Sequence, residues 1–195
     1  YPFSLTDSIS LANLGGDFGA IGNEDISSIS KGRSYGIEFL AQQKLSSSVY
    51  GIMSVTYYKS EFENKNNKLI PSAWDNRFIF NMTAGKKFKK NIELGLKFRY
   101  SGGAPYTPID LATSSNMEIW NINQRGVLDY DALNMKRLNN FHGIDLRLDK
   151  KWYFKKWSLN AYMDIENLYN FKIKLPSEVG IDPDIGEEIY TSQNS

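Results

Sequence analysis

Cysteine is absent from the 195 residues, and histidine occurs once. The lack of cysteine excludes a disulfide framework, thiolate metal sites and a cysteine nucleophile. A single histidine disfavours a histidine-based metal cluster and a Ser-His-Asp triad. Net charge is also nearly absent, because 23 Lys and Arg residues balance 22 Asp and Glu residues to +1, so the sequence predicts no nucleic-acid partner. No apolar run approaches the roughly 18 residues that a transmembrane helix needs.

What the sequence does contain is a period of two. Apolar and polar residues alternate in several segments, which is typical of strands with one apolar face. A strand of about ten residues crosses a bilayer when it is tilted. Helical periodicity is weak throughout, so six strands and no long helix are predicted. The sharply alternating segments are 91–101, 140–152 and 157–167, and the less sharp ones are 35–45, 49–59 and 74–88.

The connections between these strands alternate in length. In an antiparallel sheet this places all short turns at one end and all long loops at the other, which is the layout of outer-membrane barrels. The sequence therefore predicts an all-β fold, an antiparallel transmembrane β-barrel segment of about six strands with short periplasmic turns and long extracellular loops. The whole chain, 1–195, is predicted to be one partial β-barrel, with an extracellular loop at 1–34, six strands at 35–170 and a second extracellular loop at 171–195. The short turns fall at 46–48, 89–90 and 155–156, and the long loops at 60–73, 102–139 and from 171 onward.

Aromatic residues make up 14% of the chain, and many gather at the two ends of the predicted strands. Such rings prefer the headgroup zone of a bilayer, so two bands separated by aliphatic centres predict interfacial girdles. The alternative is that the same rings form the core of a sandwich. The band beside the Lys-Lys turns contains Phe88, Trp152, Tyr153, Phe154 and Trp157, and the opposite band contains Tyr35, Tyr57, Tyr58, Trp74 and Tyr100.

The polar positions of the strands carry many charged residues, which would all face one side of the sheet. Opposite charges on neighbouring strands can pair across the ladder. The water-filled lumen of a barrel accommodates them, and so does a solvated sheet face. Simple ion pairing along the wall is one role for them, and gating or docking of a plug is the other. The predicted lumen-wall residues are Arg77, Glu93, Lys97, Arg99, Asp145, Arg147, Asp149, Asp164 and Glu166.

Five short stretches follow one another in a recognisable order. They are Lys-Gly-Arg-Ser-Tyr-Gly-Ile-Glu at 31–38, Trp-Asp-Asn-Arg at 74–77, Ser-Gly-Gly-Ala-Pro-Tyr-Thr-Pro at 101–108, Asp-Leu-Arg-Leu-Asp-Lys at 145–150 and Met-Asp-Ile-Glu-Asn-Leu-Tyr-Asn at 163–170. Together they resemble the C-terminal part of the barrel of TonB-dependent outer-membrane receptors, over about residues 31–170.

The resemblance implies a barrel of about 22 strands around a plugged lumen. It implies a transport protein of the outer membrane of a Gram-negative bacterium, which binds a nutrient ligand and imports it with energy from TonB. The implied partners are membrane lipid, the remaining barrel strands, the plug domain and the TonB complex, and a surface lipoprotein is left open. No plug or TonB box precedes the predicted strands, so we expect an internal piece whose sheet is completed by further strands.

No catalytic constellation is found. His142 lies on the apolar face of its predicted strand, and Asp145 and Asp149 lie roughly 13 Å apart along it, too far for a paired-carboxylate site. We therefore expect no enzymatic activity, no cofactor and no metal. Ligand binding, if this segment contributes to it, is expected in the loops, although packing of the same loop residues on one another explains them equally well. The loop candidates are Phe18, Tyr106, Asp110, Trp120 and Tyr130, with Asp17, Asp129 and Asp131 as further polar groups.

Two interpretations of function remain. The first is part of an active transporter, and the alternative is a small structural or adhesive β-barrel, or a soluble β-sandwich, that displays binding loops. They differ in where the apolar side chains lie. In a transporter they face lipid, whereas in a sandwich they are sealed between two stacked sheets.

Overall fold

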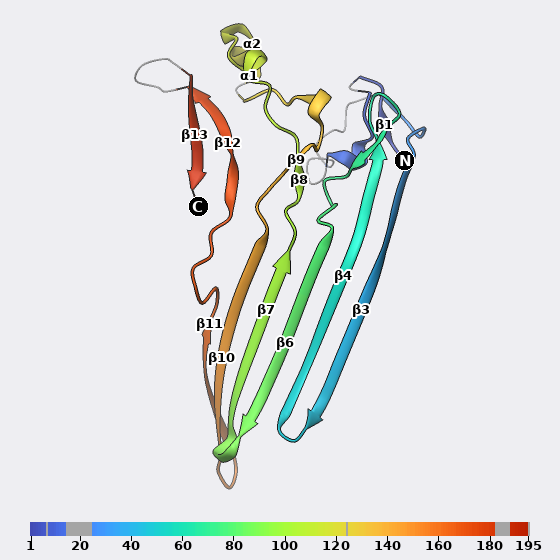
Figure 1. Cartoon of the computed structure of the whole chain (residues 1–195). Helices are drawn as coiled ribbons and strands as arrows, with labels where there is room; N and C mark the ends of the chain where they lie inside the picture. The colour runs from blue at the N-terminus through green and yellow to red at the C-terminus, as the bar shows by residue number, and fades with distance from the viewer. Residues whose placement is uncertain (7, 15–24, 124, 182–187, 195) are drawn as a thin grey trace.

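The computed structural model of the protein describes residues 1–6, 8–14, 25–123, 125–181 and 188–194. Six strands of one sheet, called the long strands below, dominate it, and the other elements lie in the connections or follow β11 (Figure 1). The long strands are β3 (Gly32–Ser46), β4 (Val49–Glu63), β6 (Phe78–Phe88), β7 (Ile92–Ser101), β10 (Phe141–Tyr153) and β11 (Ser158–Ile165). The other elements are β1 (Phe3–Ser4), η1 (Leu11–Asn13), β2 (Ile26–Ser27), β5 (Leu69–Pro71), η3 (Lys89–Asn91), β8 (Pro105–Tyr106), α1 (Leu111–Ser114), α2 (Met117–Asn123), η4 (Tyr130–Ala132), β9 (Lys136–Arg137), β12 (Lys174–Ile181) and β13 (Glu188–Asn194).

The six long strands form one antiparallel sheet in the order β11-β10-β7-β6-β4-β3, and β5 pairs with the end of β4. Strands that follow one another in the chain are neighbours in the sheet, so the topology is a meander. The sheet is open, because within the described residues β3 and β11 each pair with one long strand only. The prediction of an all-β antiparallel fold with six long strands is confirmed.

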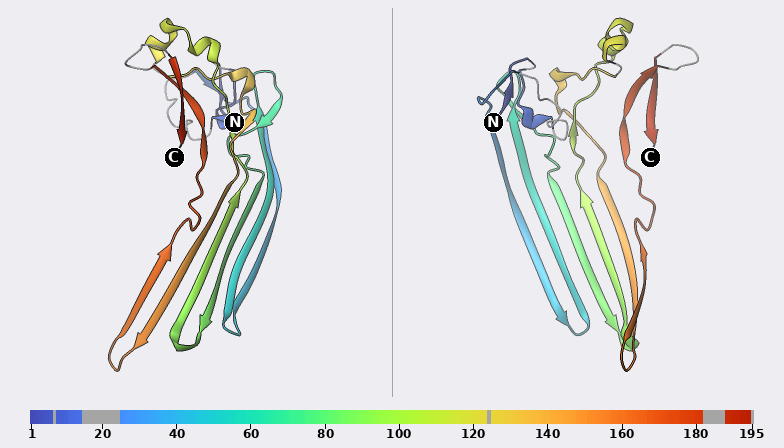
Figure 2. Two further views of the ribbon diagram at one scale, coloured as in Figure 1. Left: turned by 60° about the vertical axis from the view of Figure 1, so that its left-hand side comes forward. Right: turned by 180° about the vertical axis from the view of Figure 1, so that it is seen from behind.

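All three tight connections lie at one end of the sheet, and the long connections gather at the other (Figures 1 and 2). The turn between β3 and β4 consists of Ser47 and Ser48, which have positive φ angles of 49° and 73°. Two consecutive positive φ angles define the type I′ turn, whose twist matches that of the flanking strands. We call this end of the sheet the turn end and the opposite end the loop end.

The segments expected to be loops contain more regular structure than the sequence predicted. Residues 102–139 include the helices α1 and α2 and the short pair β8-β9, and residues 171–195 include the hairpin β12-β13. The predicted strand 74–88 starts later than expected, because β6 begins at Phe78 and not at position 74. Most of the elements within these loops have seven residues or fewer, which is too few for alternation to stand out from loop sequence. β12 is as long as β11, but it contains Pro176 and Gly180, which are unusual inside a strand.

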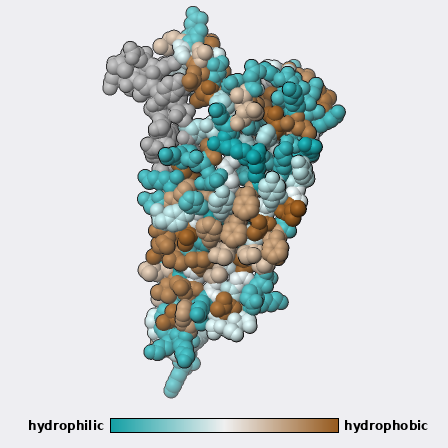
Figure 3. All heavy atoms as spheres, in the orientation of Figure 1, coloured by the Kyte–Doolittle hydropathy of each residue, from teal (hydrophilic) through white to brown (hydrophobic). Residues whose placement is uncertain are grey.

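The register joins the apolar positions of successive strands into continuous rows across the sheet. Phe39, Val55, Phe80, Tyr100 and His142 form one such row over five strands. On the face seen in Figure 3, apolar residues form a band across the long strands, with hydrophilic residues beyond it toward both ends. Side chains in this band stay exposed, including large ones, so the band lies on the surface. Examples are Ile37 at 78% exposure, Phe39 at 56% and Met163 at 56%.

No second sheet covers either face of the six long strands within the described residues. The buried apolar side chains found there are Ile9, Leu11, Trp120 and Leu133, and all four belong to connecting segments at the loop end. The long strands therefore form a single layer with no core of their own. Among the described residues, no helix has both the length and the apolar character needed to cross a membrane.

Candidate functional site

The face opposite the apolar band carries the charged residues that the alternation singled out. Pairing between β7, β10 and β11 sets Lys97 opposite Asp145, Glu93 opposite Asp149 and Arg147 opposite Asp164. Side chains at paired positions lie on the same face of a sheet. The other three expected members are Arg99, which lies on the same face of β7, Glu166, one residue beyond β11, and Arg77, one residue before β6.

Ion pairs connect these charges across neighbouring strands and, between Arg147 and Asp149, along β10. Arg99 Nη2 lies 2.9 Å from Asp145 Oδ2, and the same carboxylate accepts a hydrogen bond from the backbone N–H of Asn167. Arg147 Nε donates to Asp149 Oδ2 over 2.8 Å, and its Nη1 lies 3.5 Å from Asp164 Oδ2. These side chains are partly exposed to water, so each pair is worth little on its own. Their arrangement keeps a charged face compatible with a folded sheet.

A tyrosine crosses this polar face over a strand that has no side chain at the crossing point. Tyr50 on β4 donates a hydrogen bond to Glu93 on β7, and β6 lies between them. A Cβ atom at Gly85 of β6 would lie 2.3 Å from the Tyr50 ring, so any larger residue there would displace the ring. The hollow beside this bridge has a volume of about 550 Å³, and Lys87, Arg147 and Asp149 contribute to its lining.

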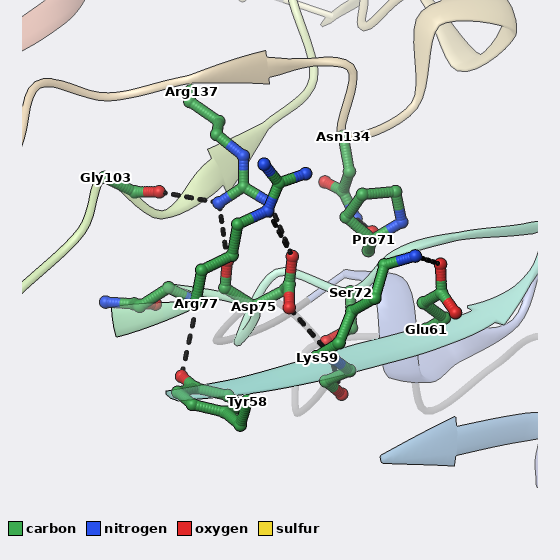
Figure 4. Close-up of polar contacts among 12 residues, drawn as sticks. Tyr58, Lys59, Glu61, Pro71, Ser72, Asp75, Arg77, Gly103, Asn134 and Arg137 are labelled. Carbon is green, nitrogen blue, oxygen red and sulfur yellow. Dashed lines mark hydrogen bonds and ion pairs between the residues drawn. The ribbon is translucent and has the colours of Figure 1, made fainter. Parts of the chain in front are cut away.

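At the loop end, a buried carboxylate ties three distant segments together (Figure 4). Asp75 is fully buried, and its Oδ1 accepts from the backbone N–H of Ser60 over 2.9 Å. Arg137 donates to Asp75 Oδ2 over 2.5 Å, and its Nη1 also donates to the carbonyl oxygens of Asp75 and Gly103. Arg77 Nε lies farther away, 3.6 Å from Asp75 Oδ2. The carboxylate thus fastens the 102–140 connection to the end of β4.

Asn134 makes a second junction beside the first. Its Nδ2 donates to the carbonyl oxygens of Asn13 and Pro71 over 2.9 and 3.0 Å, and its backbone N–H donates to Thr107 Oγ1 over 3.1 Å. Asn134 is buried and has a φ of 55°, a left-handed conformation that asparagine tolerates well. We call the segments joined by Asp75, Arg137 and Asn134 the loop platform.

The structure gives several of the loop candidates a local structural role. Asp110 caps α1, accepting hydrogen bonds from the backbone N–H and the hydroxyl of Thr113. These bonds hold the pKa of the Asp110 carboxyl below its usual value. Trp120 on α2 is buried, and the 8% of its surface that is exposed leaves little of the ring accessible to a ligand.

Most of the remaining candidates are spread along the same connection. Tyr106 lies on β8, which pairs with β9, and Tyr130 begins η4, whose cap is Asp129. Asp131 forms an ion pair with Lys65 of the β4-β5 connection. Phe18 and Asp17 lie outside the described residues.

Sequence reasoning missed the residues that organise the charged face and the loop platform. Asp75 and Arg137 are 62 positions apart, and Arg137 lies in no periodic segment, so no local signal joins them. Gly85 offered a weak signal, because a glycine inside a strand often marks a close approach of another group. His142 is held in an aromatic cluster, with its Nδ1 bonded to the Tyr169 hydroxyl and its ring 4.1 Å from that of Phe171.

Among the described residues, no group of three or more His, Cys, Asp and Glu side chains is placed to hold a metal ion. Comparisons of the chain with protein-family models, with curated proteins and with solved structures find no match.

Proposed function

We propose that this chain forms part of the wall of an outer-membrane β-barrel that imports a nutrient ligand with energy from TonB. The observation that carries the proposal is a single-layered antiparallel sheet whose apolar face is exposed while its opposite face is charged. Water stabilises one of these faces and lipid the other. A barrel wall between bilayer and lumen is the setting that meets both demands.

The height of the apolar band fits a bilayer. Phe78 and Phe88 begin and end β6 on the apolar face, and ten residue steps of about 3.3 Å separate them by about 33 Å along the strand. A strand tilted by about 40° then spans about 25 Å along the membrane normal, which is the height of the apolar band in such barrels. Exposed aromatic rings mark both borders, with Tyr57 at the loop end and Trp152 at the turn end.

The open edges of the sheet require partners in this setting. An unpaired backbone group in hydrocarbon costs several kcal/mol, so a lipid-exposed strand edge is not tolerated. The proposal therefore includes further strands that pair with the free edges of β3 and β11. The wide lumen that follows from additional strands leaves room for a plug domain against the charged face.

The importing activity rests on the family resemblance and on the loop platform. Asp75, Arg137 and Asn134 hold several long connections in one body at the loop end, where the proposed orientation places the extracellular medium. A preorganised set of loops is suited to ligand capture, because binding then costs less conformational entropy. TonB, a plug domain and a surface lipoprotein are the partners that an importer of this kind requires or accepts.

Adjacent positions on β7 provide the test of the wall. The chain has no cysteine, so Leu96→Cys and Lys97→Cys each introduce one thiol, on the apolar and the charged face respectively. In outer-membrane vesicles, we expect a membrane-impermeant maleimide to modify Lys97→Cys at least about tenfold faster than Leu96→Cys, because thiols in hydrocarbon neither ionise nor meet the reagent. Equal rates of modification at the two positions would contradict the proposal that the sheet is a barrel wall. A protein that stays folded and monomeric in plain buffer would favour the soluble alternative.

Energy coupling is tested separately in intact cells. Formaldehyde crosslinking of the affinity-tagged protein should recover TonB, and removal of TonB should abolish ligand uptake by the same cells. If the protein lies in the outer membrane but does not contact TonB, the barrel-wall proposal stands and the structural or adhesive barrel is favoured over the importer.

A further inference from the structure

The chain's positive charge is concentrated at the turn end of the sheet. The end of β6 and the connection that follows it have the sequence Lys-Lys-Phe-Lys-Lys, and the end of β10 and the connection that follows it have Lys-Lys-Trp-Tyr-Phe-Lys-Lys. We call these side chains the turn-end lysine patch. Its members are Lys86, Lys87, Lys89, Lys90, Lys150, Lys151, Lys155 and Lys156.

The near-zero net charge of the chain hides this separation. Residues 86–91 and 150–157 contain eight lysines and no acidic residue, whereas the whole chain has 23 basic and 22 acidic residues. The remaining positions therefore carry 15 basic and 22 acidic residues, a net charge of −7. A local charge of +8 beside an acidic remainder produces a strong field at one end of the sheet.

The two lysine-rich connections lie next to each other, because β7 and β10 are paired. Lys150 lies opposite Ile92 in that pairing, and its Nζ donates to the carbonyl oxygen of Lys90. Seven of the eight lysines are exposed, with Lys150 intermediate. Among the described residues, the patch makes one ion pair, between Lys87 Nζ and Glu93 at 3.9 Å. The field is therefore largely uncompensated within the chain.

Aromatic rings alternate with these lysines and continue into the apolar band. Lys86 lies 5.3 Å from the centre of the Phe88 ring, and Lys150 lies 5.5 Å from that of Trp152. Phe154 and Trp157 stack at 4.0 Å at the tip of the β10-β11 hairpin, with 49% and 58% of their surfaces exposed. Lysine stems that run along apolar rings toward charged ends suit a membrane surface, where apolar and anionic layers meet.

We propose that the turn-end lysine patch binds the anionic phospholipid headgroups of the leaflet next to the short turns. This inference rests on the proposed membrane placement. Phosphate groups supply the negative charge that the patch lacks, and each lysine near an anionic leaflet adds to the attraction. A nucleic acid would satisfy the same charges, but it would leave the apolar band beside the patch without cover. Binding to this leaflet also fixes the depth and orientation of the wall.

The experiment compares two variants with equal loss of charge. In the patch variant, Lys89, Lys90, Lys155 and Lys156 are changed to Gln. In the control variant, four exposed loop-end lysines, Lys31, Lys68, Lys136 and Lys172, are changed to Gln. Both carry Trp74→Phe, which removes the exposed loop-end tryptophan, so the quenchable signal comes mainly from Trp152 and Trp157.

The protein is purified in an uncharged detergent and moved into phosphatidylcholine nanodiscs. These contain one fifth of either brominated phosphatidylglycerol or brominated phosphatidylcholine, whose bromine atoms quench nearby tryptophan. We expect the anionic lipid to quench about threefold more than the neutral one. The excess should persist in the control variant, vanish in the patch variant and shrink as salt is raised from 50 to 500 mM, because salt screens exposed charges.

Other outcomes overturn the inference. If both lipids quench tryptophan equally in the protein with all eight lysines, the lysines do not select anionic headgroups. If 20 mM inorganic phosphate at constant ionic strength abolishes the extra quenching by the anionic lipid, the patch is a discrete phosphate site. If the lysines are needed for tight binding of a single-stranded oligonucleotide and no lipid enrichment is seen, the patch is a nucleic-acid surface. Failure of the proposed function is distinct, because the protein would then enter neither kind of nanodisc and Leu96→Cys would be modified as fast as Lys97→Cys.

Discussion

Replacing Asp75 by Ala should release the loop platform while the six-stranded sheet stays intact. The Asp75 carboxylate is fully buried and accepts from Ser60 N–H over 2.9 Å and from Arg137 over 2.5 Å. Its removal leaves the Arg137 guanidinium, which is about one quarter exposed, without its carboxylate. Breaking a buried pair in this way costs about 3 kcal/mol or more, because the remaining charge is left without compensation.

The assay is hydrogen–deuterium exchange of the platform in detergent. An opening free energy lowered by about 3 kcal/mol raises the exchange rate of amides protected by that opening by about 150-fold. The reporting amides are those of Leu138, which donates to Ala104, and Asn134, which donates to Thr107. Amides in the β7-β10 ladder should keep their rates, since the substitution removes no contact there.

Arg77→Ala serves as the matched control. Its Nε lies 3.6 Å from the same carboxylate and its side chain is half exposed, so exchange should change by about twofold at most. Unchanged exchange at Leu138 and Asn134 in Asp75→Ala would refute the assignment of Asp75 as the fastener. Equal acceleration in the platform and in the β7-β10 ladder would refute the separation of platform from sheet.

Two further predictions concern a strand and a loop. Gly85→Ala places a Cβ atom 2.3 Å from the Tyr50 ring, so denaturant unfolding should show a free energy of unfolding lowered by about 1–3 kcal/mol. Gly95→Ala, where the nearest atom lies at 3.7 Å, should lower it less. Equal losses would contradict the bridge from Tyr50 to Glu93 across Gly85. The lowered pKa of Asp110 makes its capping of α1 fully effective above the carboxyl's ordinary value of 3.8 and progressively lost as pH falls through the folded value. Amide exchange at Thr113, corrected for its intrinsic rate, should therefore rise on acidification, and Asp110→Asn should remove this pH dependence.

The six strands could be predicted because alternation is a local property that persists over many residues. The predicted segment 91–101 corresponds to β7 at Ile92–Ser101, and 157–167 corresponds to β11 at Ser158–Ile165. Alternation also indicates which residues share a face, so the sequence alone predicts that Asp145 and Lys97 lie on the same side of the sheet. Whether that face lines a lumen stays a prediction, because the register alone does not say what covers it.

The loop platform could not be predicted, because its contacts join residues without a shared pattern. Asn134 reaches Asn13 across 121 positions, and both lie in segments without periodicity. The role of Asp110 had a usable signal, since an aspartate three residues before a threonine at the start of a short helix is a common N-cap arrangement. The same carboxylate in a loop also suits ligand binding, so the sequence alone does not separate the two roles.

The two faces and the two edges of the sheet constrain its environment together. In water, the row from Phe39 to His142, which is exposed at Phe39 and partly exposed at its other positions, would have to be covered by a second layer, and the described residues contain none. In lipid, that row needs no cover, but the free edges of β3 and β11 then need backbone partners. Further strands satisfy the edges without covering the apolar face, whereas a stacked sheet covers the face without satisfying the edges. A barrel wall is thus the arrangement in which one addition to the chain meets both requirements.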